Sequence, residues 1–149
     1  MARSSGASQE DDIVSKVDSA TLRTWAGIGL IAATGLIHLV ETPEYLEEMP
    51  YIGVLFALSV VGALLAVFGI YRGERWGWTL GVLVAGGSLV GYLLSRTIGL
   101  PLFRENTWEE FAEPVGLLSL LVEGLFLVVA ASVLSVRATV NEPGTLARS

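Results

Sequence analysis

The sequence contains no cysteine, one histidine and few charged residues. The lack of cysteine excludes disulfide bonds, iron–sulfur clusters, thiolate zinc sites and a cysteine nucleophile. A single histidine excludes a metal centre made of histidines alone and haem ligation by two histidines of one chain. Charged residues make up 16% of the 149 residues, against roughly 25% in soluble domains. A chain of this composition could not cover the surface of an ordinary soluble protein.

The motifs of common enzyme classes are missing from the sequence as well. It contains no Gly-x-Ser-x-Gly elbow, phosphate-binding loop, His-Glu-x-x-His pair or dinucleotide-binding fingerprint. An isoelectric point near 4.7 and the absence of a basic patch argue against a nucleic-acid partner. We therefore expect a protein that is not an enzyme, and the sequence identifies no cofactor.

Long apolar runs are what the sequence has in abundance, since 52% of its residues are hydrophobic and its mean hydropathy is +0.63. Four runs are each close to the length that crosses a hydrocarbon core of ~30 Å. They cover residues 24–41, 51–71, 77–96 and 114–136. We predict an all-α protein, an integral membrane antiparallel four-helix bundle over residues 23–137. Flexible polar tails are expected over residues 1–22 and 138–149.

The distribution of positive charge predicts the orientation of these spans, because Lys and Arg accumulate on the cytoplasmic side of a membrane. Seven of the nine Lys and Arg residues fall on the side that holds both termini, and only Arg96 and Arg104 fall on the other. We expect a plasma-membrane protein with both termini in the cytoplasm. The outer connections are acidic, which indicates either a solvated rim or a funnel for cations. Their glutamates are Glu41, Glu44, Glu47, Glu48, Glu105, Glu109, Glu110 and Glu113.

Small residues recur at helical spacing in the third run, at Gly77, Gly81 and Ala85. Helices in lipid associate through such residues because they allow close approach of the backbones. We expect the stripes to pack within the chain, although Gly87 and Gly91 also form a GxxxG pair that a dimer would use. A further expectation concerns Pro43, which should begin a separate short interfacial helix over residues 44–48, capped by Thr42.

Three ionisable residues, His38, Arg96 and Glu123, lie within or at the ends of the apolar runs. Ionisable groups are costly in a membrane and persist where they are paired or used. Glu123 lies nine residues into the fourth run, about 13 Å along a helix axis. The chain order places all three in the outer half of the bundle. Arg96 should therefore pair with Glu123 or Glu113, and His38 should bond Glu41 or a backbone carbonyl.

Three short segments carry a resemblance to known proteins. They are Gly-Leu-Ile-His-Leu from Gly35 with Pro-Glu-Tyr-Leu from Pro43, Ser-Arg-Thr-Ile-Gly-Leu-Pro from Ser95, and Glu-Pro-Val-Gly from Glu113. With these segments the chain resembles a family of small, uncharacterised prokaryotic membrane proteins with four spans, over roughly residues 24–135. The resemblance implies the four-span fold and the importance of these segments, and it implies no activity.

The polar cluster of His38, Glu41, Arg96 and Glu123 leaves several functions open. It could be structural and fix the register of the helices, or it could bind a small polar or anionic ligand. A metal site would use His38, Glu41 and Glu123, and proton transfer would use His38 and Glu123. The chain could also be an accessory subunit of a larger membrane complex or a homo-oligomer. The ligand-binding set would comprise His38, Glu41, Tyr92, Arg96, Glu113 and Glu123.

Overall fold

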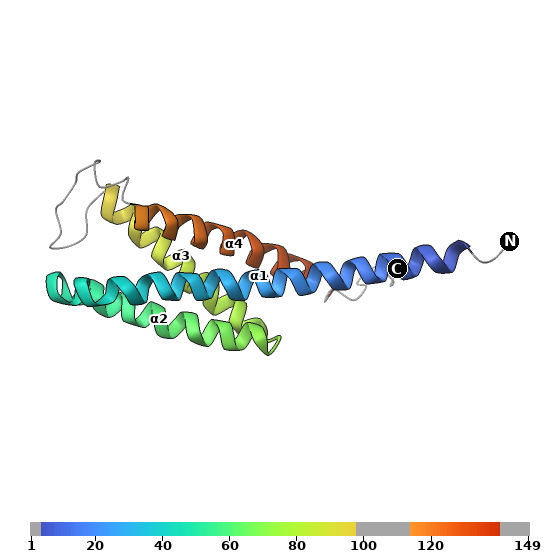
Figure 1. Cartoon of the computed structure of the whole chain (residues 1–149), viewed down its shortest axis with the longest axis horizontal. Coiled ribbons are helices and arrows are strands. Elements are labelled where there is room, and N and C mark those ends of the chain that lie inside the picture. The colour runs from blue at the N-terminus through green and yellow to red at the C-terminus, as the bar shows by residue number, and fades with distance from the viewer. Residues whose placement is uncertain (1–3, 98–113, 141–149) are drawn as a thin grey trace, which may run out of the picture.

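The described part of the chain forms four α-helices, α1 (Ser4–Glu48), α2 (Pro50–Tyr71), α3 (Arg75–Thr97) and α4 (Pro114–Val140), shown in Figure 1. This is a computed structural model that describes the backbone of residues 4–97 and 114–140 and the side chains of residues 14–97 and 114–135. Each helix packs against the next along the chain, and α1 also packs against α4, which closes the ring. The predicted all-α four-helix bundle is confirmed.

Gly73 and its neighbours end α2 and form the turn that leads into α3. Gly73 adopts φ = +75°, the left-handed conformation that glycine reaches without steric cost. Its N–H donates to the Ile70 carbonyl at 2.9 Å, and the Glu74 N–H donates to the Gly69 carbonyl at 2.9 Å. These two bonds form a Schellman motif. The motif satisfies the last carbonyls of α2 and reverses the chain into α3 within a few residues.

Helix α1 is much longer than the apolar run from which it was predicted. The predicted tail is helical from Ser4 onward, and Figure 1 shows this part of α1 projecting beyond the other three helices. No proline precedes Pro43, so nothing covalent stops the helix from continuing out of the apolar run. A polar composition indicated a tail, but polar residues are compatible with a solvated helix.

The separate interfacial helix expected over residues 44–48 is wrong, because α1 continues through Pro43 to Glu48. Thr42 does not cap a new helix. Its hydroxyl donates to the His38 carbonyl at 2.6 Å, within α1. Proline removes only the N–H that would bond Leu39, and the flanking turns remain helical. The last turn of α1 then packs on α2 at Gly53, where an added Cβ would lie 2.6 Å from the backbone of Leu46.

The interior of the bundle is made of small residues and a few large rings. The buried set includes Ala63, Ala66, Ala85 and Ala130, with Ile31 and Ile70 beside them. Trp78 stacks on Phe126 with ring centroids 6.0 Å apart. Glycines make room for these rings, since a Cβ on Gly27 would strike Trp78 and one on Gly81 would strike Phe126. The intramolecular role predicted for Gly81 is confirmed.

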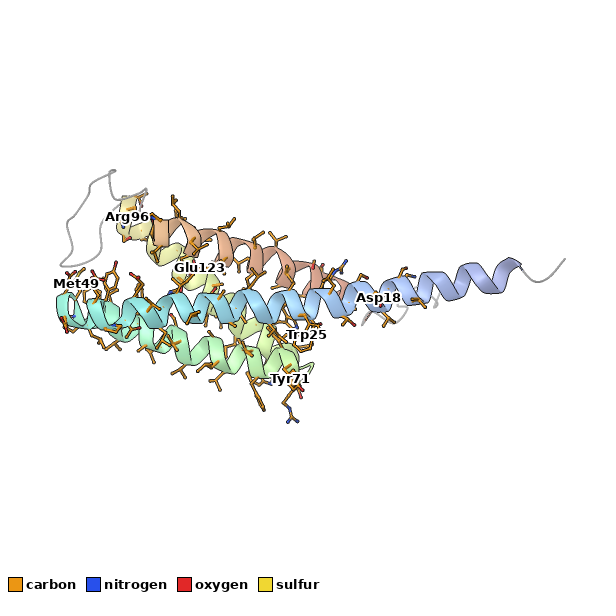
Figure 2. All side chains as sticks on the ribbon, viewed as in Figure 1. Asp18, Trp25, Met49, Tyr71, Arg96 and Glu123 are labelled. Carbon is orange, nitrogen blue, oxygen red and sulfur yellow. The ribbon has the colours of Figure 1, made fainter. Side chains whose placement is uncertain are left out.

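Large apolar side chains lie mostly on the outside of the bundle, as Figure 2 shows for all four helices. Leu64, Leu83 and Val128 are each about two-thirds exposed. A soluble monomer rarely exposes contiguous apolar patches of more than a few hundred Å². All four helices are long and apolar enough to cross a membrane.

We predict that Gly77→Ala destabilises the bundle by about 1–3 kcal/mol, because an added Cβ would overlap the backbone of Gly69 and Ile70. Gly87→Ala is the matched control on the same helix, since no atom lies within 4 Å of its Cβ position. It should be neutral or stabilising by up to about 1 kcal/mol. Denaturant unfolding in detergent measures both. Equal losses in the two variants would contradict the close approach of α2 and α3 at Gly77.

Candidate functional site

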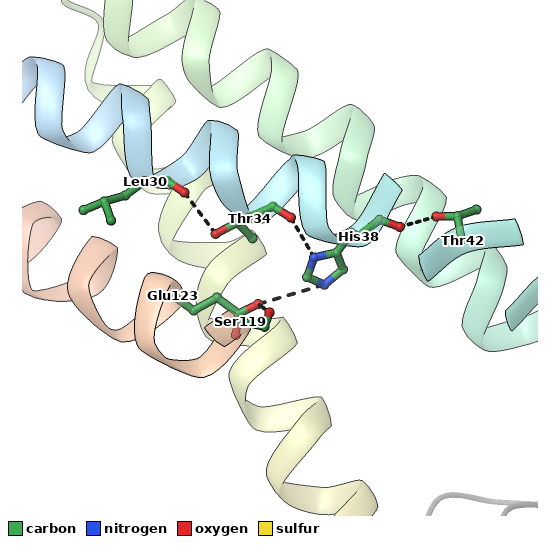
Figure 3. Close-up of polar contacts among 6 residues, drawn as sticks. All are labelled: Leu30, Thr34, His38, Thr42, Ser119 and Glu123. Carbon is green, nitrogen blue, oxygen red and sulfur yellow. Dashed lines mark hydrogen bonds and ion pairs between the residues drawn. The ribbon is translucent and has the colours of Figure 1, made fainter. Parts of the chain in front are cut away.

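The side chain of His38 lies in the interior of the bundle and is oriented by its own helix. His38 is 5% exposed, and its Nδ1 lies 2.9 Å from the Thr34 carbonyl one turn earlier in α1 (Figure 3). A carbonyl oxygen only accepts, so Nδ1 must carry a proton to make this bond. The bond fixes both the ring orientation and the tautomer. Nε2 is left facing helix α4.

Hydrogen bonds of the same kind repeat along this face of α1. The Thr34 hydroxyl donates to the Leu30 carbonyl at 3.2 Å, and the Thr42 hydroxyl donates to the His38 carbonyl at 2.6 Å. The polar side chains are spaced four residues apart and therefore lie on one side of the helix. Each uses a carbonyl of the preceding turn, so their polar hydrogens are satisfied without help from another helix.

Glu123 reaches the same place from α4. It is 1% exposed, and its Oε1 accepts a hydrogen bond of 2.9 Å from the Ser119 hydroxyl (Figure 3). Ser119 precedes Glu123 by four residues and thus stands one turn away on the same face. The hydroxyl orients the carboxylate and satisfies one of its lone pairs. A buried carboxylate needs such partners because desolvation penalises it strongly.

The two side chains meet between α1 and α4, where His38 Nε2 lies 4.0 Å from Glu123 Oε1. Because Nδ1 already carries a hydrogen, Nε2 carries a second one only when the ring is charged. The carboxyl group offers a hydrogen only when it is neutral. The contact is therefore favourable when one proton is placed between the groups, on the imidazole or on the carboxyl.

Aromatic side chains enclose the pair on two sides. The rings of His38 and Phe56 of α2 meet edge to face with centroids 4.8 Å apart, and Tyr45 meets the same Phe56 ring at 4.8 Å. Phe126 follows Glu123 by three residues and stacks on Trp78. The stacked rings close the bundle toward the α2–α3 turn. Thr34 lies one helical turn from His38 toward that turn, whereas Glu41, Tyr92 and Arg96 lie toward the opposite end of the bundle.

Arg96 and Tyr92 form a second group at that end. The Arg96 guanidinium lies 5.3 Å from the centroid of the Tyr92 ring, and the Tyr92 ring lies against Gly116 of α4. Gly116 precedes Glu123 by two helical turns, about 10 Å along the axis. The sequence suggested that Arg96 pairs with Glu123, but the contacts of Glu123 come from Ser119 and His38.

Other predicted site residues have different outcomes. Glu41 is half-buried on α1, three residues after His38. Glu113 lies outside the described residues. Within residues 14–97 and 114–135, no three histidine, cysteine, aspartate or glutamate side chains gather as a metal site requires. His38, Glu41 and Glu123 are therefore not brought together as the metal-ligand set that their composition suggested.

Sequence reasoning missed Ser119, Thr34 and Thr42 as parts of the site. Their signal was the spacing of four residues, which links Ser119 to Glu123 and runs from Thr34 through His38 to Thr42. Hydroxyl residues at this spacing from an ionisable residue in an apolar helix are candidates to orient it.

Comparison with protein-family models, curated proteins and solved structures gives no match to this chain. The resemblance to the small four-span family therefore stays a prediction, and function has to be argued from the geometry of the site.

A double-mutant cycle tests which partner Glu123 has. We predict that His38→Ala and Glu123→Ala couple by about 0.5–3 kcal/mol in stability, because each removes the other's partner. The control cycle pairs Arg96→Ala with Glu123→Ala and should be additive within about 0.5 kcal/mol. Stability is measured by denaturant unfolding in detergent. Coupling in the control cycle with additivity in the first would reverse the assignment.

Proposed function

We propose that this chain is a four-span integral membrane protein in which His38 and Glu123 form a buried site that binds and exchanges one proton. The membrane part of the proposal is supported by the distribution of side chains. Alanine, glycine and the polar residues Thr34, His38 and Glu123 are inside, whereas leucine and valine cover the outside. This arrangement suits a protein whose solvent is lipid, where small residues allow helix contact.

We further propose that both termini lie in the cytoplasm, with the α2–α3 turn on the same side. The antiparallel order places the start of α1, the α2–α3 turn and the end of α4 toward one end of the bundle (Figure 1). The turn region carries Arg72 and Arg75, and α1 carries Lys16 and Arg23 toward the same end. Positive residues favour the cytoplasmic side. The end of the bundle that holds Tyr92 and Arg96 would then face outward.

Single-cysteine labelling tests this orientation, and the chain suits it because it has no native cysteine. We predict that a membrane-impermeant maleimide labels Glu44→Cys in intact cells, whereas Ser15→Cys and Glu74→Cys react only after the membrane is opened. All three positions are exposed in the structure, so access depends on the side of the membrane. Labelling in the opposite order would invert the topology, and labelling of all three in intact cells would argue against a membrane barrier.

The proton-binding part of the proposal rests on one observation, the buried contact of 4.0 Å between His38 Nε2 and Glu123 Oε1. The other ring nitrogen of His38, Nδ1, is already bonded to the Thr34 carbonyl. Such a contact is favourable with one proton and unfavourable with none, because a neutral imidazole would then present a lone pair to a carboxylate. Two protons would leave a buried positive charge beside a neutral acid. Gain or loss of a proton thus changes the interaction that joins α1 to α4.

Infrared difference spectroscopy across a pH titration measures this exchange. We predict a band of a buried, protonated carboxyl group that changes with pH, disappears in Glu123→Gln and shifts its midpoint in His38→Ala. Glu47→Gln is the control, because Glu47 is an exposed carboxylate near the end of α1, the helix that also carries His38. The buried-carboxyl band could instead stay constant over the whole pH range in which exposed carboxylates and a histidine titrate. That result would leave the pair with a structural role only.

A further inference from the structure

A groove lies at the end of the bundle that holds the α2–α3 turn. It runs between α1 and the last residue of α2, with a volume of about 280 Å³. Its lining residues are Ala20, Thr21, Thr24, Trp25, Ile28 and Tyr71. The volume is slightly below the roughly 300–1,000 Å³ of sites that enclose a whole drug-sized ligand. A groove of this size suits a polar head group whose apolar remainder lies elsewhere.

The two rings of the groove are held in place by each other. Trp25 and Tyr71 meet edge to face, with centroids 6.4 Å apart, although their side chains are 58% and 70% exposed. Figure 2 places both at the same end of the bundle. Tyrosine and tryptophan with one apolar and one polar end are typical of the boundary between lipid and water. Tyr71 is the last residue of the apolar α2, which puts the groove at that boundary.

The lining changes in polarity along α1 in the same order as a phospholipid. Ile28 lies toward the apolar part of the helix, Trp25 and Thr24 come next, and Thr21 and Ala20 lie farthest out. The lining supplies N–H and O–H donors from Trp25, Tyr71 and Thr21, while the phosphate and ester groups of a phospholipid supply acceptors. Thr24 donates to the Ala20 carbonyl at 3.0 Å and can still accept.

Among the side chains described at this end of the bundle, positive residues outnumber acidic ones, with Lys16, Arg23, Arg72 and Arg75 against Asp18 and Glu74, and none of these six lines the groove itself. Arg23 lies within the α1 segment that forms it, and Arg72 follows Tyr71, with its guanidinium 5.5 Å from the centroid of Phe68. Positive residues near a membrane surface attract anionic lipids. We propose that this groove binds the head group of an anionic phospholipid of the leaflet that faces the α2–α3 turn, with the acyl chains on the apolar surface beyond Ile28. The inference rests on the membrane-spanning part of the proposed function and is independent of the proton site.

Native mass spectrometry of the full chain in mild detergent tests the proposal, with phosphatidylglycerol and phosphatidylcholine of identical acyl chains as probes. The first phosphatidylglycerol should bind more tightly than phosphatidylcholine. Tyr71→Ala and Trp25→Ala should each weaken it about five- to tenfold, since each removes a donor and a ring. Trp25→Phe keeps a ring without the N–H and should give an intermediate loss. Tyr51→Ala is the matched control at the other end of α2 and should bind as the wild type does.

Two results would overturn the proposal. One is equal binding of the two lipids by the wild-type chain, and the other is equal binding of phosphatidylglycerol by Tyr71→Ala and Tyr51→Ala. Thermal unfolding in lipid-free detergent shows whether each variant is folded, so that a loss of binding is not a loss of structure. Alkaline extraction of cell membranes tests membrane insertion separately. A chain that is extracted would refute the membrane assignment, whatever the lipid measurement shows.

Discussion

Close contact between helix backbones is the constraint on which the rest of this structure depends. Where the outer surface is as apolar as the interior, burial of large side chains gives little reason for helices to associate, and packing has to supply it. Gly77 against Gly69 joins α2 to α3, and Gly35 against Ala63 joins α1 to α2, with an added Cβ at Gly35 only 2.9 Å from its neighbour. These contacts set the rotation of each helix about its axis. The rotation in turn decides which polar residues face inward.

The polar site follows from that rotation together with bonds made inside single helices. Thr34 orients His38 within α1, and Ser119 orients Glu123 within α4. In each helix, one polar atom of the side chain is therefore already hydrogen-bonded within the same helix, and the side chain also faces the other helix. The residual interaction across the α1–α4 interface is a single contact of 4.0 Å. Its strength depends on the proton, whereas the contacts that hold the helices do not.

The sequence was sufficient for the four helices, because long apolar runs and the turn at Gly73 are local signals. It also indicated that His38 and Glu123 lie in the same half of the bundle, because their depth follows from counting residues. It could not identify the partner of Glu123. Arg96 has a long side chain that reaches many positions, and choosing between it and His38 requires the rotation of α1 against α4. The length of α1 was missed for a different reason, since a solvated polar helix has no apolar pattern.

The two ends of the bundle differ in what lies beside the His38–Glu123 pair. Toward the α2–α3 turn, Thr34 is the one further buried polar side chain among the described residues, its hydroxyl donates within α1, and Trp78 stacks on Phe126 beyond it. Toward the other end, Glu41, Tyr92 and Arg96 supply polar atoms within a few turns. A proton moves along polar groups and water and not through stacked rings. The stacked rings beyond Thr34 therefore favour the proposed proton-responsive contact between α1 and α4 over a proton path across the bundle.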